Sequence, residues 1–216
     1  MIDIHPPHEA AQSWRDIFIH LAIITVGLFI ALSLEGCVEW WHHRNLVGEA
    51  RANIRTEMQD NQKELKDALA QIHKEQAEIK ADIEALNTLR KNVNAHGLSV
   101  VLHFSNSDLE NASWNTARDT GALAYMGYPE VKKYAEIYHL QQIFSDQTTR
   151  VTSAYTNSFS VLYIFEIDNK GSAGVQKADI STALQKVLAV QSELLVYEST
   201  AGELEKEYRD ALQQQF

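Results

Sequence analysis

Residues 17–34 read IFIHLAIITVGLFIALSL, an apolar run of about 18 residues without Asp, Glu, Lys or Arg. That length is near the minimum with which a helix crosses the hydrocarbon core of a bilayer. Trp14 precedes the run, and Trp40 and Trp41 follow it, as expected for aromatic anchors at the two membrane interfaces. Because the run is long and bracketed at both ends, a transmembrane helix over 17–38 explains it better than a buried core helix of a soluble protein.

Two kinds of cleavable signal compete with this interpretation. A secretory signal peptide has a basic N-terminal region, whereas the single basic residue here, Arg15, is opposed by Asp3, Glu9 and Asp16. The sequence LEGC at 34–37 has the leucine, glycine and cysteine of a lipoprotein signal, but its glutamate is out of place in that motif. We therefore expect an uncleaved anchor that follows a polar tail over 1–16.

One face of the predicted transmembrane helix carries small and polar residues. His20, Gly27, Ala31 and Glu35 fall on this face, because helical neighbours recur every three to four residues. Gly27 and Ala31 form a small-xxx-small pair that lets two helices approach closely, so we predict a helix–helix interface here. A proton or ion path through the two ionisable residues is the alternative. It is the weaker one, since His20 can reach the interface and Glu35 lies at the membrane exit.

The segment 39–95 is predicted to form a long stalk helix. It contains no proline, and its apolar residues recur in steps of three and four, which indicates an amphipathic helix. If the stalk is continuous with the anchor, the helix runs about 80 residues and needs partners of its own chain or of other copies. A coiled coil and a homo-oligomer are the expected consequences.

Residues 96–216 are predicted to form a helical bundle that packs on the distal stalk. Ser107 to Glu110 match a capping box for a short helix that contains Trp114 and ends near Met126. Pro129 suits the first turn of a helix that runs to about Asp168, and a last helix is expected from about Asp179 to Gln214. Residues 97–104 are an extended connector without a firm assignment. The predicted fold class is all-α: the anchor continues into a long amphipathic helix, which packs with one short and two long helices as an antiparallel bundle.

Composition limits the classes of function. The formal net charge is −10, and no basic face is evident, so we expect no binding to nucleic acid. Cys37 is the single cysteine, which excludes an internal disulfide and a cysteine-based zinc site. The sequence contains no Gly-rich phosphate loop, no Gly-x-Ser-x-Gly elbow and no His-Glu-x-x-His helix. We therefore predict no enzyme, no catalytic residue and no cofactor.

Candidate metal ligands are sparse. His5 and His8 flank two prolines and could present two imidazoles, but two ligands do not close a site. Glu39-x-x-His42 and Glu136-x-x-His139 each match half of a carboxylate-bridged di-iron motif. With 18 glutamates and nine histidines in 216 residues, chance predicts roughly one such match (18 × 9/216 ≈ 0.75), so we predict no metal site.

Four aromatic residues of the C-terminal part suggest either core packing or a ligand pocket. They are Trp114, Tyr125, Tyr134 and Tyr138. Buried aromatic rings commonly build a core with their hydroxyl groups at its edge, and this is the favoured interpretation. A small-molecule pocket lined by the same rings is the alternative.

Two stretches resemble a group of uncharacterised bacterial single-pass membrane proteins. The first is HPPHEAAQSWRDIFIHLAIITVGLFIALSLE at 5–35 with EWWHHR at 39–44, and the second is SWNTARDTGALAYMGYPEVKKYAEIYHLQQ at 113–142. The resemblance implies an inner-membrane protein with a periplasmic C-terminal domain, and it implies no activity. The positive-inside rule points the other way, because Arg44, Arg51 and Arg55 follow the anchor and Arg15 alone precedes it.

The sequence thus favours a non-enzymatic, membrane-anchored scaffold or accessory protein. Its partners would be the lipid bilayer and copies of itself or subunits of a larger complex, associated through the transmembrane and stalk helices. The alternative is a helical bundle that senses a ligand and signals through a partner.

Overall fold

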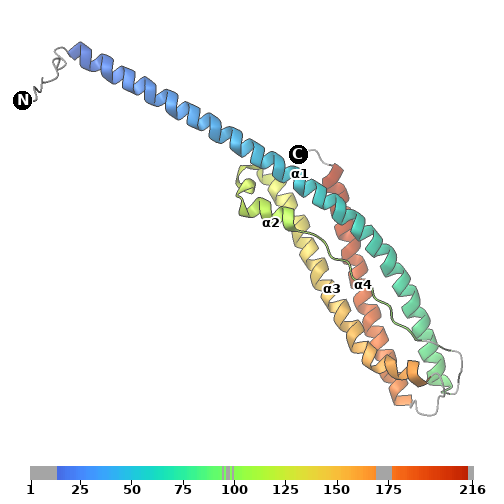
Figure 1. Cartoon of the computed structure of the whole chain (residues 1–216). Coiled ribbons are helices and arrows are strands. Elements are labelled where there is room, and N and C mark those ends of the chain that lie inside the picture. The colour runs from blue at the N-terminus through green and yellow to red at the C-terminus, as the bar shows by residue number, and fades with distance from the viewer. Residues whose placement is uncertain (1–13, 94, 96–97, 99, 169–176, 214–216) are drawn as a thin grey trace, which may run out of the picture. The chain divides into compact units, whose positions relative to one another are not determined.

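The computed structural model describes residues 14–93, 95, 98, 100–168 and 177–213, which form helices and connecting segments without a β-strand. The helices are α1 (Trp14–Lys91), α2 (Ala112–Asp119), the short 3-10 helix η1 (Ala122–Tyr125), α3 (Tyr128–Asp168) and α4 (Lys177–Gln213) (Figure 1). The all-α class is confirmed. The chain divides into two units, residues 1–49 and 50–216.

The first unit contains the N-terminal part of α1. This part is long and apolar enough to cross a membrane, and none of its most apolar window is buried. Trp14, Trp40 and Trp41 are exposed, and the Arg44 guanidinium lies 5.4 Å from the ring centroid of Trp40. The polar tail over 1–13, with His5 and His8, lies outside the described residues. The predicted anchor therefore presents its apolar side chains to its surroundings.

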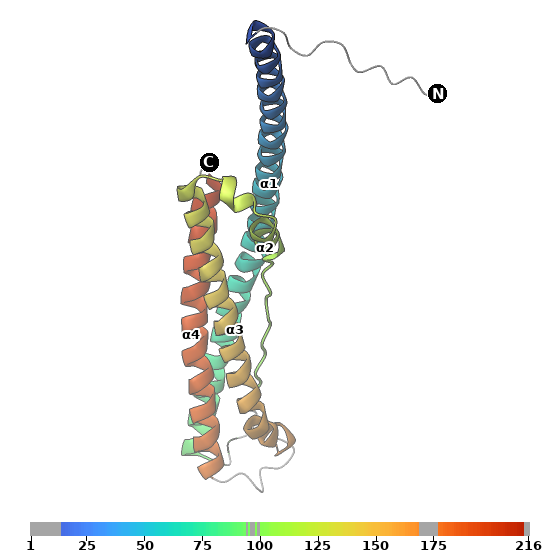
Figure 2. The same ribbon diagram turned by 90° about the vertical axis from the view of Figure 1, so that its left-hand side faces the viewer.

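In the second unit, α1 from residue 50 onward packs with α3 and α4. Contacts from α1 to α3 advance together along both helices, from Arg51–Glu130 to Glu57–Tyr138, so these two helices run parallel. Contacts from α1 to α4 advance in opposite directions, from Gln62–Glu205 to Gln76–Glu198. Helix α4 is therefore antiparallel to both α1 and α3 (Figures 1 and 2).

An extended segment returns the chain from the end of α1 to the start of α2. We call residues 100–111 the strap; they form neither helix nor strand and run between α1 and α3 (Figure 1). The strap takes the place that a fourth helix occupies in an up-down bundle. The predicted connector over 97–104 was thus too short, and the predicted capping box at Ser107–Glu110 is wrong, because it lies in the strap. Helix α2 begins at Ala112, after an N-cap Asn111 that makes no side-chain capping bond.

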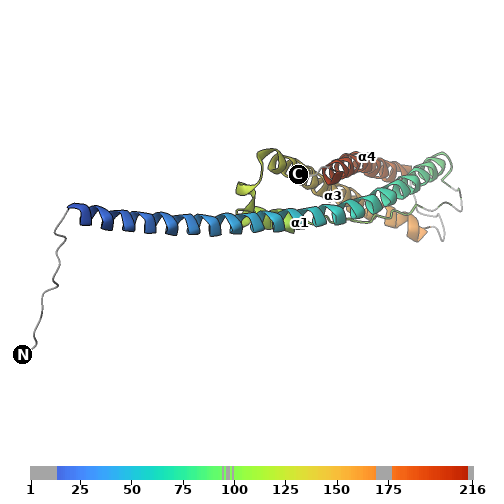
Figure 3. The same ribbon diagram turned by 90° about the horizontal axis from the view of Figure 1, so that it is seen from above.

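The apolar face of the stalk is covered within the chain. Side chains at seven-residue spacing on α1 are at most 2 % exposed, namely Met58, Leu65, Ile72, Ile79 and Leu86. Helices α3 and α4 run along this part of α1 (Figure 3). The expectation that copies associate through an uncovered stalk stripe therefore loses its motivation, since this stripe is already buried.

Adjacent leucines on α4 allow a matched test of this core. Leu194 is completely buried, whereas Leu195 is 55 % exposed. We predict that Leu194→Ala lowers the free energy of unfolding by about 2–5 kcal/mol, because it leaves a cavity. Leu195→Ala should change it by less than ~0.5 kcal/mol, as is usual at the surface. Denaturant unfolding of the full-length protein in detergent, followed by circular dichroism, measures both; equal losses would contradict this packing.

Candidate functional site

A second row of α1 side chains faces the strap. Each of its members lies four residues before a member of the first row, and they are Ile54, Asn61, Ala68, Glu75 and Asp82, all of them buried. Two carboxylates and one carboxamide are unusual in such a row, because burying them without hydrogen-bond partners is costly. The strap provides these partners.

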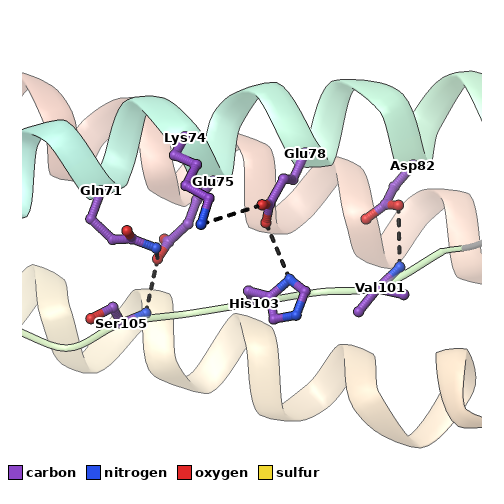
Figure 4. A network of polar contacts seen from close by, with 8 residues as sticks. All are labelled: Gln71, Lys74, Glu75, Glu78, Asp82, Val101, His103 and Ser105. Atoms are coloured by element: carbon purple, nitrogen blue, oxygen red, sulfur yellow. Dashed lines mark hydrogen bonds and ion pairs between the residues drawn. The ribbon is translucent and has the colours of Figure 1, made fainter.

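The carboxylates of the second row accept hydrogen bonds from the strap backbone. Val101 N–H donates to Asp82 Oδ1 at 3.2 Å, and Ser105 N–H donates to Glu75 Oε1 at 2.9 Å. Between them, His103 Nδ1 lies 3.2 Å from Glu78 Oε2. Figure 4 shows these contacts along one side of α1. An extended segment without a neighbouring strand has no backbone acceptors for its N–H groups. Here the carboxylates of a helix accept these hydrogen bonds.

Asn61 binds the strap at its C-terminal end through both atoms of its carboxamide. Its Oδ1 accepts from Glu110 N–H at 2.8 Å, and its Nδ2 donates to Glu110 O at 2.7 Å. From α3, Gln141 Nε2 donates to the same carbonyl at 2.9 Å and to that of Leu109 at 3.1 Å. Tyr208 on α4 donates its hydroxyl to Gln141 Oε1 at 2.6 Å. The strap is therefore bound by side chains from α1 and α3, with α4 orienting one of them.

Glu57 connects α1 to both α2 and α3. Its Oε2 accepts from Ser113 N–H at 2.7 Å, which satisfies one of the free amides at the start of α2. Its Oε1 accepts from the Tyr138 hydroxyl at 2.5 Å. The Tyr138 ring in turn stacks on Trp114, with ring centroids 5.2 Å apart and planes 10° from parallel. One buried carboxylate thus fixes the positions of two aromatic rings.

Burial changes the proton affinity of the second row. Desolvation raises the pKa of Asp82 to about 6 and also raises the pKa of Glu75, while the bonds from Val101 and Ser105 partly oppose the shifts. Oxygens Asp82 Oδ2 and Glu75 Oε2 are buried and have no hydrogen-bond partner. The pKa of the nearby Tyr155 is raised too, first by burial and then by the Glu75 charge. The tyrosine therefore stays neutral and adds no further negative charge beside these carboxylates.

A pocket of about 430 Å³ lies where the strap, α2 and α3 meet. Of the four rings considered from the sequence, Trp114 and Tyr138 line it. Tyr134 is buried, with its hydroxyl 3.3 Å from Glu130 Oε1, and Tyr125 lies in η1 and is 53 % exposed; neither lines this pocket. Burial and Glu130 raise the pKa of Tyr134 to about 12. The structure thus brings together two of the four rings.

The remaining candidate residues lie apart from this site. His20, Gly27, Ala31 and Glu35 are exposed on α1, and His20 Nδ1 lies 2.7 Å from its own helix at Asp16 O. No group of three or more His, Cys, Asp or Glu side chains that could hold a metal ion occurs among the described residues. Within that part of the chain, neither Glu-x-x-His motif therefore acquires further ligands.

Comparison of the chain with models of protein families, with curated proteins and with solved structures found no match. The buried polar side chains around the strap bind backbone groups and orient aromatic rings, so they hold the structure in position.

The residues that bind the strap were missed at the level of sequence, although a signal for them exists. The first heptad row of α1 is apolar at five successive positions, whereas the second contains Asn61, Glu75 and Asp82. A helix that packs on helices through both rows carries apolar residues in both. Polar residues restricted to one row indicate a neighbour that donates hydrogen bonds, such as an extended backbone.

The raised pKa of Asp82 gives a pH dependence with a definite sign. As the pH rises from about 4 to about 6, unfolded chains lose this proton before folded ones do, so the free energy of unfolding falls. We predict that Asp82→Asn, which keeps an acceptor for Val101, reduces this slope by up to ~1.4 kcal/mol per pH unit. Denaturant unfolding in detergent at several pH values measures it.

The change of the free energy of unfolding with pH is compared, and not its absolute value. The amide nitrogen that Asp82→Asn introduces would also be buried without a partner, which destabilises the variant at every pH. Asp67→Asn makes the same chemical change at an exposed position of the same helix and should leave the slope unchanged. An identical slope in wild type and Asp82→Asn would contradict the assignment.

Proposed function

We propose that this chain is a non-enzymatic, membrane-anchored scaffold or accessory protein that self-associates through its transmembrane segment. The observation that carries the proposal is the exposure of the apolar run. Large apolar side chains from Ile17 to Leu34 are 47–67 % exposed, and no element of the described chain covers them. A lipid bilayer covers such a surface, and a second helix can cover part of it.

Self-association is assigned to the anchor face with Gly27 and Ala31, and the stalk stripe is no longer part of the proposal. Both residues are exposed, and a Cβ added at Gly27 would meet nothing within 4 Å apart from the adjacent backbone of its own helix. Small residues four apart allow two backbones to approach closely and to gain van der Waals contacts in lipid. Anchoring in one membrane also confines copies of the chain to the same layer, which raises their effective concentration.

The non-enzymatic part of the proposal is supported by how the buried polar groups of the second unit are used. Glu57, Asn61 and Gln141 bind backbone amides, carbonyls or a tyrosine hydroxyl at 2.5–3.1 Å. A general acid or base must lie within hydrogen-bond reach of a substrate. The unsatisfied carboxylate oxygens of Glu75 and Asp82 are instead buried under the strap.

Two alanines on opposite faces of the anchor test the interface. Ala22 and Ala31 are nine residues apart, which places them about 180° apart around the helix. We predict that Ala31→Leu weakens self-association about tenfold, because it separates the backbones, and that Ala22→Leu leaves it unchanged. Mass measurement of the full-length protein in nanodiscs, over a range of protein-to-lipid ratios, distinguishes the two variants. A wild-type protein that is monomeric at every ratio would sink the proposal.

We also propose that the C-terminal unit lies in the periplasm of a bacterial cell. The resemblance of residues 5–44 and 113–142 supports this side, although the arginine distribution favours the cytoplasm. Alkaline phosphatase fused after the last residue should be active, because it matures in an oxidising compartment. A green fluorescent protein fused at the same place should stay dark in this orientation. The reverse pair of results would place the unit in the cytoplasm.

A further inference from the structure

The pocket between the strap, α2 and α3 has the size and the access of a small-molecule site. Its volume of about 430 Å³ lies within the range of such sites. Its walls come from three segments, the strap, α2 and α3, and two residues of α1 hold these segments in place. Asn61 binds the strap, and Glu57 binds both α2 and Tyr138 on α3. The pocket is therefore formed before any ligand arrives, which lowers the entropic cost of binding.

The lining favours a neutral ligand with many hydroxyl groups. Nine of the 17 lining residues are Asn, Gln, Ser or Thr, whereas only Asp108, Arg118 and His139 bring a charge or an imidazole. Arg118 is already paired with Asp119 at 3.1 Å. Carboxamides and hydroxyls both donate and accept hydrogen bonds, as do the hydroxyls of a ligand. A phosphate or an amino acid would need charged partners instead.

Trp114 gives the pocket a flat apolar surface beside Tyr138 and Phe144, which also line it. Trp114 lines the pocket while its ring is held parallel to the buried Tyr138 ring. Because the Tyr138 hydroxyl donates to Glu57, the tryptophan packs on a ring that is itself fixed in position. A flat aromatic surface surrounded by neutral hydrogen-bonding groups suits a ring with C–H groups on one face and hydroxyls at its edge.

We propose that this pocket binds a neutral saccharide. Trp114 contacts the C–H face of a sugar ring, and side chains at the rim bind its hydroxyls. Asn106 on the strap and Gln142 on α3 are both exposed lining residues. Gln142 Nε2 donates to Asp146 Oδ1 at 2.9 Å, which leaves its carbonyl oxygen to accept from a ligand hydroxyl. The inference goes beyond a scaffold role, since it gives the C-terminal unit a ligand of its own, and it does not depend on self-association.

Fluorescence of Trp114 in the full-length protein tests the proposal. Trp14, Trp40 and Trp41 are the other tryptophans, so replacing these three with phenylalanine leaves one reporter in the pocket. Maltose, cellobiose and chitobiose are the neutral probes, and glutamate and lysine are the charged ones, each titrated against the protein in nanodiscs. We expect a saturable change in emission with at least one disaccharide and none with either amino acid.

Matched variants separate binding in the pocket from effects elsewhere. Asn106→Ala should weaken binding of the responding disaccharide about threefold to tenfold, through the loss of one or more hydrogen bonds. Asn157→Ala removes the same group from an exposed position of α3 outside this pocket and should change nothing. No saturable response to any disaccharide, a response to the amino acids alone, or equal affinities in the two variants would overturn the proposal.

Discussion

The second unit depends on the pairing of an extended backbone with the side chains of a helix. The strap has no neighbouring strand, so its amides would be left without partners between α1 and α3. Asp82, Glu75 and Asn61 provide acceptors at intervals of seven or fourteen residues, and the strap amides that meet them belong to Val101, Ser105 and Glu110. Burial of carboxylates destabilises the unit, and these bonds offset part of that cost. The polar groups thereby specify where the strap lies.

The strap also explains why α1 and α3 run parallel. A short loop after α1 would have produced an antiparallel neighbour, as in an up-down bundle. An extended chain covers about 3.3 Å per residue against 1.5 Å in a helix. Twelve residues of strap therefore span the distance that would otherwise need a helix of more than 20. Its small cross-section leaves room on the α3 side, and the pocket with Trp114 lies there.

Much of the fold followed from patterns that do not depend on tertiary context. The long apolar run, the helical periodicity of the stalk and Pro129 at the start of α3 are local signals, and the helices lie where these signals placed them. The prediction of a capping box at Ser107–Glu110 was wrong because other groups compete for the amide that the serine would bind. Here the Glu110 N–H donates to Asn61 instead. A pocket lined by aromatic rings was an alternative at the level of sequence, but which two of the four rings meet could not be predicted. The contact between Trp114 and Tyr138 depends on Glu57, more than 50 residues earlier in the chain.

The packing of the first long helix against the last has a consequence for the order in which the chain folds. Helix α1 is made first, yet His73 and Arg55 find their partners 125 and 157 residues later, on α4. Contacts so distant in sequence slow folding, because a long loop must close before they form. During synthesis, the apolar row from Met58 to Leu86 stays uncovered until α4 has emerged. A nascent chain in this state is exposed to aggregation and to chaperones, whereas the finished bundle is not.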